Sequence, residues 1–90
     1  MPVTYTVVLM REEEGGYSVS VPALKGCHTQ GDSLPEALLM ADDAVRLCLE
    51  VLQEDGQPVP PDKPDVTVNM QNATEALVYR LTVREAAAVA

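Results

Sequence analysis

The fold of this chain is decided by residues 15–38, which read GGYSVSVPALKGCHTQGDSLPEAL. Apolar and hydroxyl side chains alternate over residues 17–21, which predicts a strand with one face toward a core. Pro22 ends that strand because it has no N–H to donate to a neighbouring strand. Gly26 suits a chain reversal, and residues 27–30 then predict a short strand. This stretch therefore encodes two strands that lead directly into a helix.

The start of the helix is the clearest local signal in the sequence. Ser33 is a good N-cap, and Glu36 three positions later completes a capping box. Pro35 falls in the first turn, where its missing N–H has no intrahelical partner to lose. The pattern predicts a helix from Leu34 to about Asp55, ended by Gly56. Its apolar stripe consists of Leu34, Leu38, Ala41, Val45, Cys48 and Leu52, widened by Ala37, Ala44 and Leu49.

The predicted helix is longer than the strands that it covers. At 1.5 Å per residue it spans about 33 Å, whereas a strand of six residues spans about 20 Å. We expect its last turns to extend beyond the sheet or to meet another chain.

Working outward, residues 3–10 predict a first strand that pairs antiparallel with residues 17–21 through a Glu- and Gly-rich turn. A proline-rich connection follows the helix, and residues 65–70 predict a fourth strand. In the tail, the pattern of residues 76–83 is consistent with either a strand or a helix, and we interpret it as a short strand followed by a short helix.

The order β-β-β-α-β predicts an α+β fold. We expect a three-stranded antiparallel meander, one long amphipathic helix packed on one face, and a fourth strand that returns to the sheet. Residues 1–70 form the expected α+β domain, and residues 71–90 are expected to be a short C-terminal extension.

Composition narrows the classes of function. The chain has 90 residues and a formal net charge of −8, which disfavours nucleic acid and anionic membranes and favours a basic protein partner. The alternative explanation of this negative charge is that it only keeps the protein soluble. We see no signal peptide and no apolar run of the ~18 residues that a membrane span needs, so we expect a cytoplasmic protein with reduced thiols.

No catalytic constellation is expected. Asp32, Glu36 and Asp65 are candidates for a metal-dependent nuclease site, but such a site also needs a carboxylate on the first strand, where residues 3–10 have none. Cys27 and His28 are adjacent on a strand, so their side chains point to opposite faces. We therefore expect no enzyme activity, no cofactor and no metal.

The chain resembles the HicB-type antitoxin domain over roughly residues 3–70. The resemblance rests on pieces in the family's order and spacing: Gly16-Tyr17, Pro22-Ala23-Leu24-Lys25-Gly26-Cys27, Thr29-Gln30-Gly31-Asp32, Ser33-Leu34, Glu36-Ala37, Ala41, Ala44 and Gly56-Gln57-Pro58-Val59-Pro60.

This resemblance implies a partly degraded RNase H-like fold and a role in neutralising a small basic ribonuclease toxin, HicA, by direct binding. It also implies assembly into dimers or tetramers. Many members carry a C-terminal DNA-binding module of about 40 residues or more. Only 20 residues follow Met70 in this chain, so we do not expect it to bind DNA.

Two hypotheses for function follow. In the first, an antitoxin-like protein binds a HicA-type toxin. In the second, a structural or regulatory homo-oligomer acts without a toxin. The candidate partner-binding residues lie on the hairpin tip and the outer sheet face: Glu12, Glu13, Glu14, Ser18, Ser20, His28 and Gln30.

Overall fold

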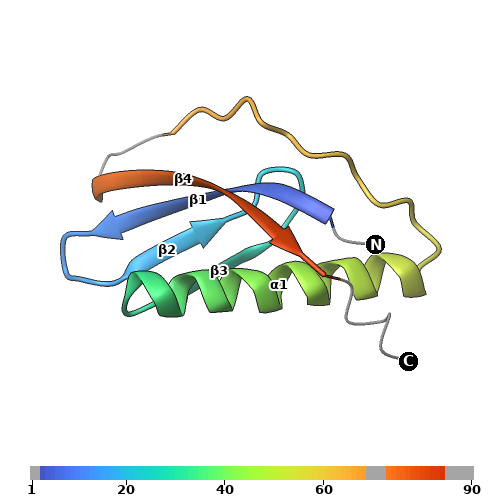
Figure 1. Cartoon of the computed structure of the whole chain (residues 1–90), viewed down its shortest axis with the longest axis horizontal. Coiled ribbons are helices and arrows are strands. Elements are labelled where there is room, and N and C mark those ends of the chain that lie inside the picture. Colours follow the sequence, from blue (N-terminus) through green and yellow to red (C-terminus); the bar gives the residue numbers. More distant parts are fainter. Residues whose placement is uncertain (1–2, 69–72, 85–90) are drawn as a thin grey trace.

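The computed structural model describes residues 3–68 and 73–84 of the chain. It contains β1 (Val3–Glu12), β2 (Tyr17–Ser20), β3 (His28–Gly31), α1 (Leu34–Glu54) and β4 (Ala73–Val83). The strands form one antiparallel sheet in the order β3-β2-β1-β4. Helix α1 packs along one face of this sheet (Figure 1). The predicted α+β fold with a returning fourth strand is therefore confirmed.

Both ends of α1 are capped as the sequence predicts. The Ser33 hydroxyl accepts a hydrogen bond of 3.2 Å from the Glu36 N–H, and the Glu36 carboxylate accepts one of 2.9 Å from the Asp32 N–H. The second bond thus goes to the residue before the N-cap rather than to the N-cap itself. At the other end, Gly56 has a φ of 68°, and its N–H donates to the Gln53 carbonyl at 3.1 Å. The last turns of the helix extend past the ends of the strands (Figure 1).

The core lies between α1 and the inner face of the sheet. Small helix residues allow a close approach, because Ala37, Ala41 and Val45 are the helix positions that are fully buried. The closest approach is at Gly31 of β3, where a Cβ atom would lie 2.5 Å from the backbone nitrogen of Ala37. The remaining buried apolar residues around them are Tyr5, Val7, Leu9, Val19, Val21, Leu24, Cys27 and Val83.

The position predicted for the fourth strand is wrong. That strand is Ala73–Val83, which pairs with β1 along almost its whole length, whereas residues 65–68 form no strand. The long helix ends beyond the sheet, so the chain uses residues 57–68 to travel back across it (Figure 1). The short strand predicted over residues 76–83 belongs to β4. Residues 69–70 and the helix expected in the tail lie outside the described residues.

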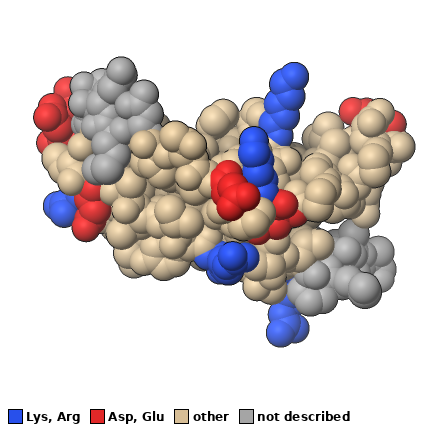
Figure 2. Space-filling view, turned by 90° about the horizontal axis from the view of Figure 1, so that it is seen from above, with Lys and Arg blue, Asp and Glu red and all other residues tan. Residues whose placement is uncertain are grey.

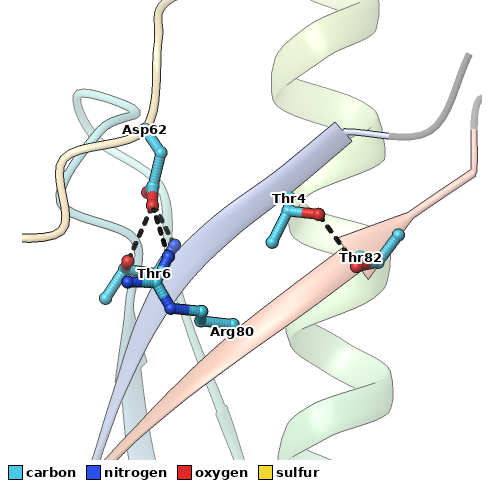
Figure 3. A network of polar contacts seen from close by, with 5 residues as sticks. All are labelled: Thr4, Thr6, Asp62, Arg80 and Thr82. Atoms are coloured by element: carbon cyan, nitrogen blue, oxygen red, sulfur yellow. Dashed lines mark hydrogen bonds and ion pairs between the residues drawn. The ribbon is translucent and has the colours of Figure 1, made fainter.

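The returning segment seals the part of the β1 edge that β2 does not reach. Asp62 accepts hydrogen bonds from the N–H of Thr6 at 2.7 Å and from its hydroxyl at 2.9 Å. Arg80 of β4 lies 3.7 Å from the same carboxylate (Figure 3). The Tyr5 hydroxyl donates to the Pro60 carbonyl at 2.7 Å. As a result Thr6, which the outer sheet face would otherwise expose, is buried.

Acid should weaken this seal. Desolvation acts to raise the pKa of Asp62, but the hydrogen bonds from Thr6 and Lys63 and the charge of Arg80 outweigh it and lower the pKa below its usual 3.8. A carboxyl group with a lowered pKa in the folded state stabilises the fold above the unfolded pKa, and this contribution is lost as the pH falls through the folded pKa.

We therefore expect Asp62→Asn to lower the free energy of unfolding by about 1 kcal/mol near neutral pH, where hydrogen bonds to a charged acceptor are lost. The difference from the wild type should shrink below pH 3.8. Urea unfolding at several pH values measures both effects. Asp65→Asn is the matched control in the same segment, since Asp65 is exposed. Identical pH profiles for wild type and Asp62→Asn would contradict the assignment.

Candidate partner-binding surface

An acidic concavity of about 650 Å³ lies at the end of the sheet where β1 turns into β2. The turn is tight: the Glu12 N–H donates to the Gly16 carbonyl at 3.1 Å, and the Gly15 N–H donates to the Glu12 carbonyl at 3.0 Å. Both glycines have positive φ, 98° for Gly15 and 79° for Gly16, a conformation that other residues rarely adopt. The residues that line the concavity are Glu12, Glu13, Glu14, Gly15, Gly16, Tyr17, Ser18, Gln30, Gly31 and Asp32.

Strand pairing brings the second wall of the concavity to the first. Tyr17 pairs with Gly31 and Ser18 with Gln30, so the end of β3 and Asp32 lie beside the hairpin turn. The lining carries four carboxylates and no Lys or Arg. Ser18 donates a hydrogen bond of 2.8 Å to Glu12, which fixes that carboxylate. Figure 2 shows acidic side chains at this end of the molecule, with one basic side chain beside them, and further acidic side chains elsewhere on the same face.

The structure brings five of the seven candidate residues together. Glu12, Glu13, Glu14, Ser18 and Gln30 line the concavity. Ser20 and His28 pair with each other further along β2 and β3, outside the concavity. His28 is exposed whereas Cys27 is buried, as expected for neighbours on a strand.

Sequence reasoning missed Asp32 as part of this surface. It considered Asp32 only as a candidate for a nuclease site, and the Asp32 carboxylate joins the three glutamates only through the pairing of β2 with β3. The usable signal was the hairpin register, which places Gly31 opposite Tyr17.

A second hollow of about 570 Å³ lies between the outer sheet face and the returning segment. Val8, Met10 and Ser20 form its floor, and Lys63 and residues 65–68 form its wall. The outer face is thus less open than the sequence predicts, because residues 57–68 cross it.

Helix α1 also exposes apolar side chains that the sequence analysis placed on neither face. Leu39, Met40, Leu47 and Val51 are exposed. Met40, Leu47 and Val51 follow one another at spacings of 7 and 4, with the half-buried Ala44 of the core-facing stripe between the first two, so they form a line along one side of the helix. The signal was present in the sequence as a second set of apolar residues at helical spacing.

The two cysteines are free thiols, Cys27 buried and Cys48 half-buried. Burial, together with the neighbouring Cys48 thiol, raises the pKa of Cys27 to about 12. Cys27 is therefore protonated at neutral pH and is a poor nucleophile. Among the described residues, no group of three or more His, Cys, Asp or Glu side chains is placed to hold a metal ion. No helix in the described part of the chain is long and apolar enough to cross a membrane.

The fold and this surface define a small α+β domain with an acidic hollow at one end of its sheet. Residues 5–86 match the family described as HicB_like antitoxin of bacterial toxin-antitoxin system. The chain belongs to this family, and the protein is thus an antitoxin of a toxin–antitoxin system.

Two curated relatives show how far the sequence similarity extends. A UPF0150 protein of Thermoplasma acidophilum is 41% identical over 66 residues, which cover 72% of this chain and 96% of that protein. Antitoxin HicB 1 of Photorhabdus laumondii is 46% identical over 56 residues, which cover 62% of this chain and 36% of that protein.

Solved structures share the fold. A chain of a toxin–antitoxin complex from Streptococcus pneumoniae superposes with a TM-score of 0.75 at 19% identity and covers 93% of this chain and 70% of that one. The N-terminal domain of Burkholderia pseudomallei antitoxin HicB superposes with a TM-score of 0.65 at 19% identity. The match covers 91% of this chain and 99% of that domain. The predicted resemblance to HicB-type antitoxins is confirmed.

Proposed function

We propose that this protein neutralises a small basic ribonuclease toxin of the HicA type by binding it directly, in the cytoplasm and without catalysing a reaction. The observation that carries the proposal is the acidic concavity, in which four carboxylates gather without a neighbouring lining cation. Family membership supports the class of partner, because the family's antitoxins belong to toxin–antitoxin systems.

Charge and apolar surface have different parts in this proposal. A cluster of carboxylates accelerates the encounter with a basic protein, whereas burial of apolar surface holds the complex together. The exposed line on α1, with Met40, Leu47 and Val51, offers such apolar surface. The outer sheet face, with Ser20 and His28, offers polar groups for orientation.

The direct test is to purify this protein and the product of a small basic reading frame next to its gene. We expect a complex in size-exclusion chromatography, and we expect the complex to lack the RNA cleavage of the free toxin. No complex, even at low salt, would overturn the proposal. Cleavage of an RNA–DNA hybrid by this protein alone with magnesium or manganese would overturn the non-catalytic part.

Neutralising the hairpin glutamates should slow toxin binding. We expect the triple variant Glu12→Gln, Glu13→Gln and Glu14→Gln to lower the association rate constant about tenfold at low salt, because steering by clustered charge contributes on the order of 10-fold or more. The dissociation rate constant should stay close to the wild-type value. Surface plasmon resonance across a salt series measures both, and the difference in association should vanish at about 1 M salt, where the Debye length is about 3 Å.

The matched control removes three negative charges elsewhere. Glu50, Glu54 and Asp55 lie towards the C-terminal end of α1, at the opposite end of the molecule from the hairpin turn (Figure 1). Replacing them by Gln, Gln and Asn changes the net charge equally and should leave the association rate constant almost unchanged. An equal loss in both triple variants would mean that overall charge, rather than the concavity, steers the toxin.

A further inference from the structure

Strand β4 presents the longest open edge of the sheet. It has eleven residues and lies at the end of the strand order, paired only with β1 in the part of the chain that the structure describes. The opposite edge strand, β3, has only four residues. The part of β1 that β2 leaves free is closed by Asp62. The free part of β1 is therefore sealed, the edge at β3 is short, and the edge at β4 is long and open.

Two of the usual devices that block an edge strand, Pro and Lys, are missing from β4. Proteins protect such edges with Pro, with charged side chains, especially Lys, or with a bulge. Residues 73–83 contain neither Pro nor Lys, and their two charged residues, Glu75 and Arg80, lie on either side of the apolar centre at Val78 and Tyr79. The only irregularity in the pairing with β1 lies at the far end, between Arg11 and Glu12. From Glu75 to Val83 the edge is regular and suitable for pairing with another strand.

Hydrogen bonding of Thr6 shows which backbone groups of β4 face outward. The Thr6 N–H bonds to Asp62 and so points away from β4. Thr6 lies opposite Arg80, and opposed residues of an antiparallel pair either both face each other or both face away. The N–H and C=O of Arg80 therefore point to the open edge. The direction of these backbone groups alternates along a strand, so the N–H and C=O groups of Ala76, Val78 and Thr82 also point to the open edge.

The middle of this edge is apolar and exposed. Val78 is 53% exposed and Tyr79 is 36% exposed. They point to opposite faces of the sheet, since they are neighbours on a strand. A strand added at this edge would cover both of them as well as the free backbone groups.

We propose that the occupant of this edge is β4 of a second copy of the chain, paired antiparallel about a two-fold axis at Val78. Outward-facing groups lie on even-numbered residues, so even-numbered residues of the two copies must lie opposite each other. The register that pairs all of residues 73–83 meets this condition and places Val78 opposite Val78 of the other copy. The two four-stranded sheets then form one continuous sheet of twice that width.

Side chains fit this register. On one face Leu77 lies opposite Tyr79 of the other copy, an aliphatic–aromatic cross-strand pair. Glu75 lies opposite Leu81 and Arg80 opposite Ala76, so no like charges face each other. The exposed apolar centre of the edge is buried in its own symmetry mate, which explains why these residues are apolar.

The test uses opposite charges at the two-fold axis. Val78→Lys and Val78→Glu each place like charges opposite each other in the pair, so each variant alone should be monomeric. An equimolar mixture should form a heterodimer, because Lys then faces Glu. Sedimentation equilibrium at micromolar concentration should give twice the 9.7 kDa chain mass for the wild type and for the mixture, and the chain mass for each variant alone. Circular dichroism verifies that both variants are folded.

Leu47→Lys and Leu47→Glu are the matched controls, because Leu47 is an apolar residue on the helix that is 61% exposed, compared with 53% for Val78. Both should remain dimeric. A monomeric wild type, or dimers of both Val78 variants alone, would overturn the proposal. So would a monomeric wild type whose toxin binding is lost on Val78→Lys, since the toxin would then occupy this edge. The protein is tested without toxin, so failure of the dimer leaves the antitoxin proposal standing.

Discussion

Replacing Gly31 by alanine is expected to lower the free energy of unfolding by about 3 kcal/mol or more, the upper end of the cost of overpacking a core. The added Cβ would lie 2.5 Å from the nitrogen and 2.7 Å from the Cα of Ala37. Both are backbone atoms of the first turn of α1, so no side-chain rotation can relieve the contact. The helix must move away from β3, and the buried contacts of Ala37 and Ala41 loosen with it.

An opposing effect is too small to compensate. A Gly to Ala change restricts the unfolded chain and stabilises by about 0.4–1 kcal/mol where the native conformation allows it. The clash exceeds this gain, so the net effect is a loss. Thermal unfolding followed by circular dichroism should show it as a fall of more than about 10 °C, at about 4–8 °C per kcal/mol for a domain of this size.

Gln30→Ala is the control on the same strand, because the Gln30 side chain is exposed. The free energy of unfolding of Gln30→Ala should stay within about 0.5 kcal/mol of the wild-type value. If Gly31→Ala proved as stable as Gln30→Ala, the close contact between β3 and α1 would be refuted.

The second large effect is expected for Leu9→Ala. Leu9 is completely buried on the inner face of β1, between β2 and β4 and beneath the helix. Truncation removes its apolar contacts and leaves a cavity, which together cost about 2–5 kcal/mol for a buried leucine. We expect a lower midpoint in urea with an unchanged slope.

Leu39→Ala makes the same chemical change at a position that is 67% exposed on α1. It should change stability by less than about 0.5 kcal/mol, because surface substitutions have small effects. A comparable loss in both variants would mean that Leu39 is buried in solution, for example by a partner copy, and would contradict its place on the free surface.

Local patterns predicted most of this fold. The Ser33–Glu36 box and Gly56 define the ends of the helix correctly, since capping depends only on groups a few residues apart. The alternation over residues 17–21 and the reversal at Gly26 predicted the meander for the same reason. The acidic hairpin tip was also visible, because charge is a property of composition.

The candidate site was predicted only in part. The three glutamates and Gln30 belong to segments that the sequence places on neighbouring strands, so their meeting at one concavity follows from hairpin register. Asp32 was missed because it joins them from beyond β3. Asp62 was missed because nothing in a proline-rich connection distinguishes the carboxylate that will seal β1.

The sequence by itself determined the capped helix, the three-stranded meander and the acidic turn at residues 12–16. Tertiary structure alone decided which later segment completes the sheet. Residues 65–70 and 76–83 carry similar apolar patterns, and a local pattern cannot rank two candidates for the same place. The free side of β1 pairs with the segment that reaches it once the chain has returned from the far end of a long helix, and this depends on contacts distant in sequence. For the same reason, only the assembled sheet shows that, among the residues the structure describes, β4 is left with an open edge.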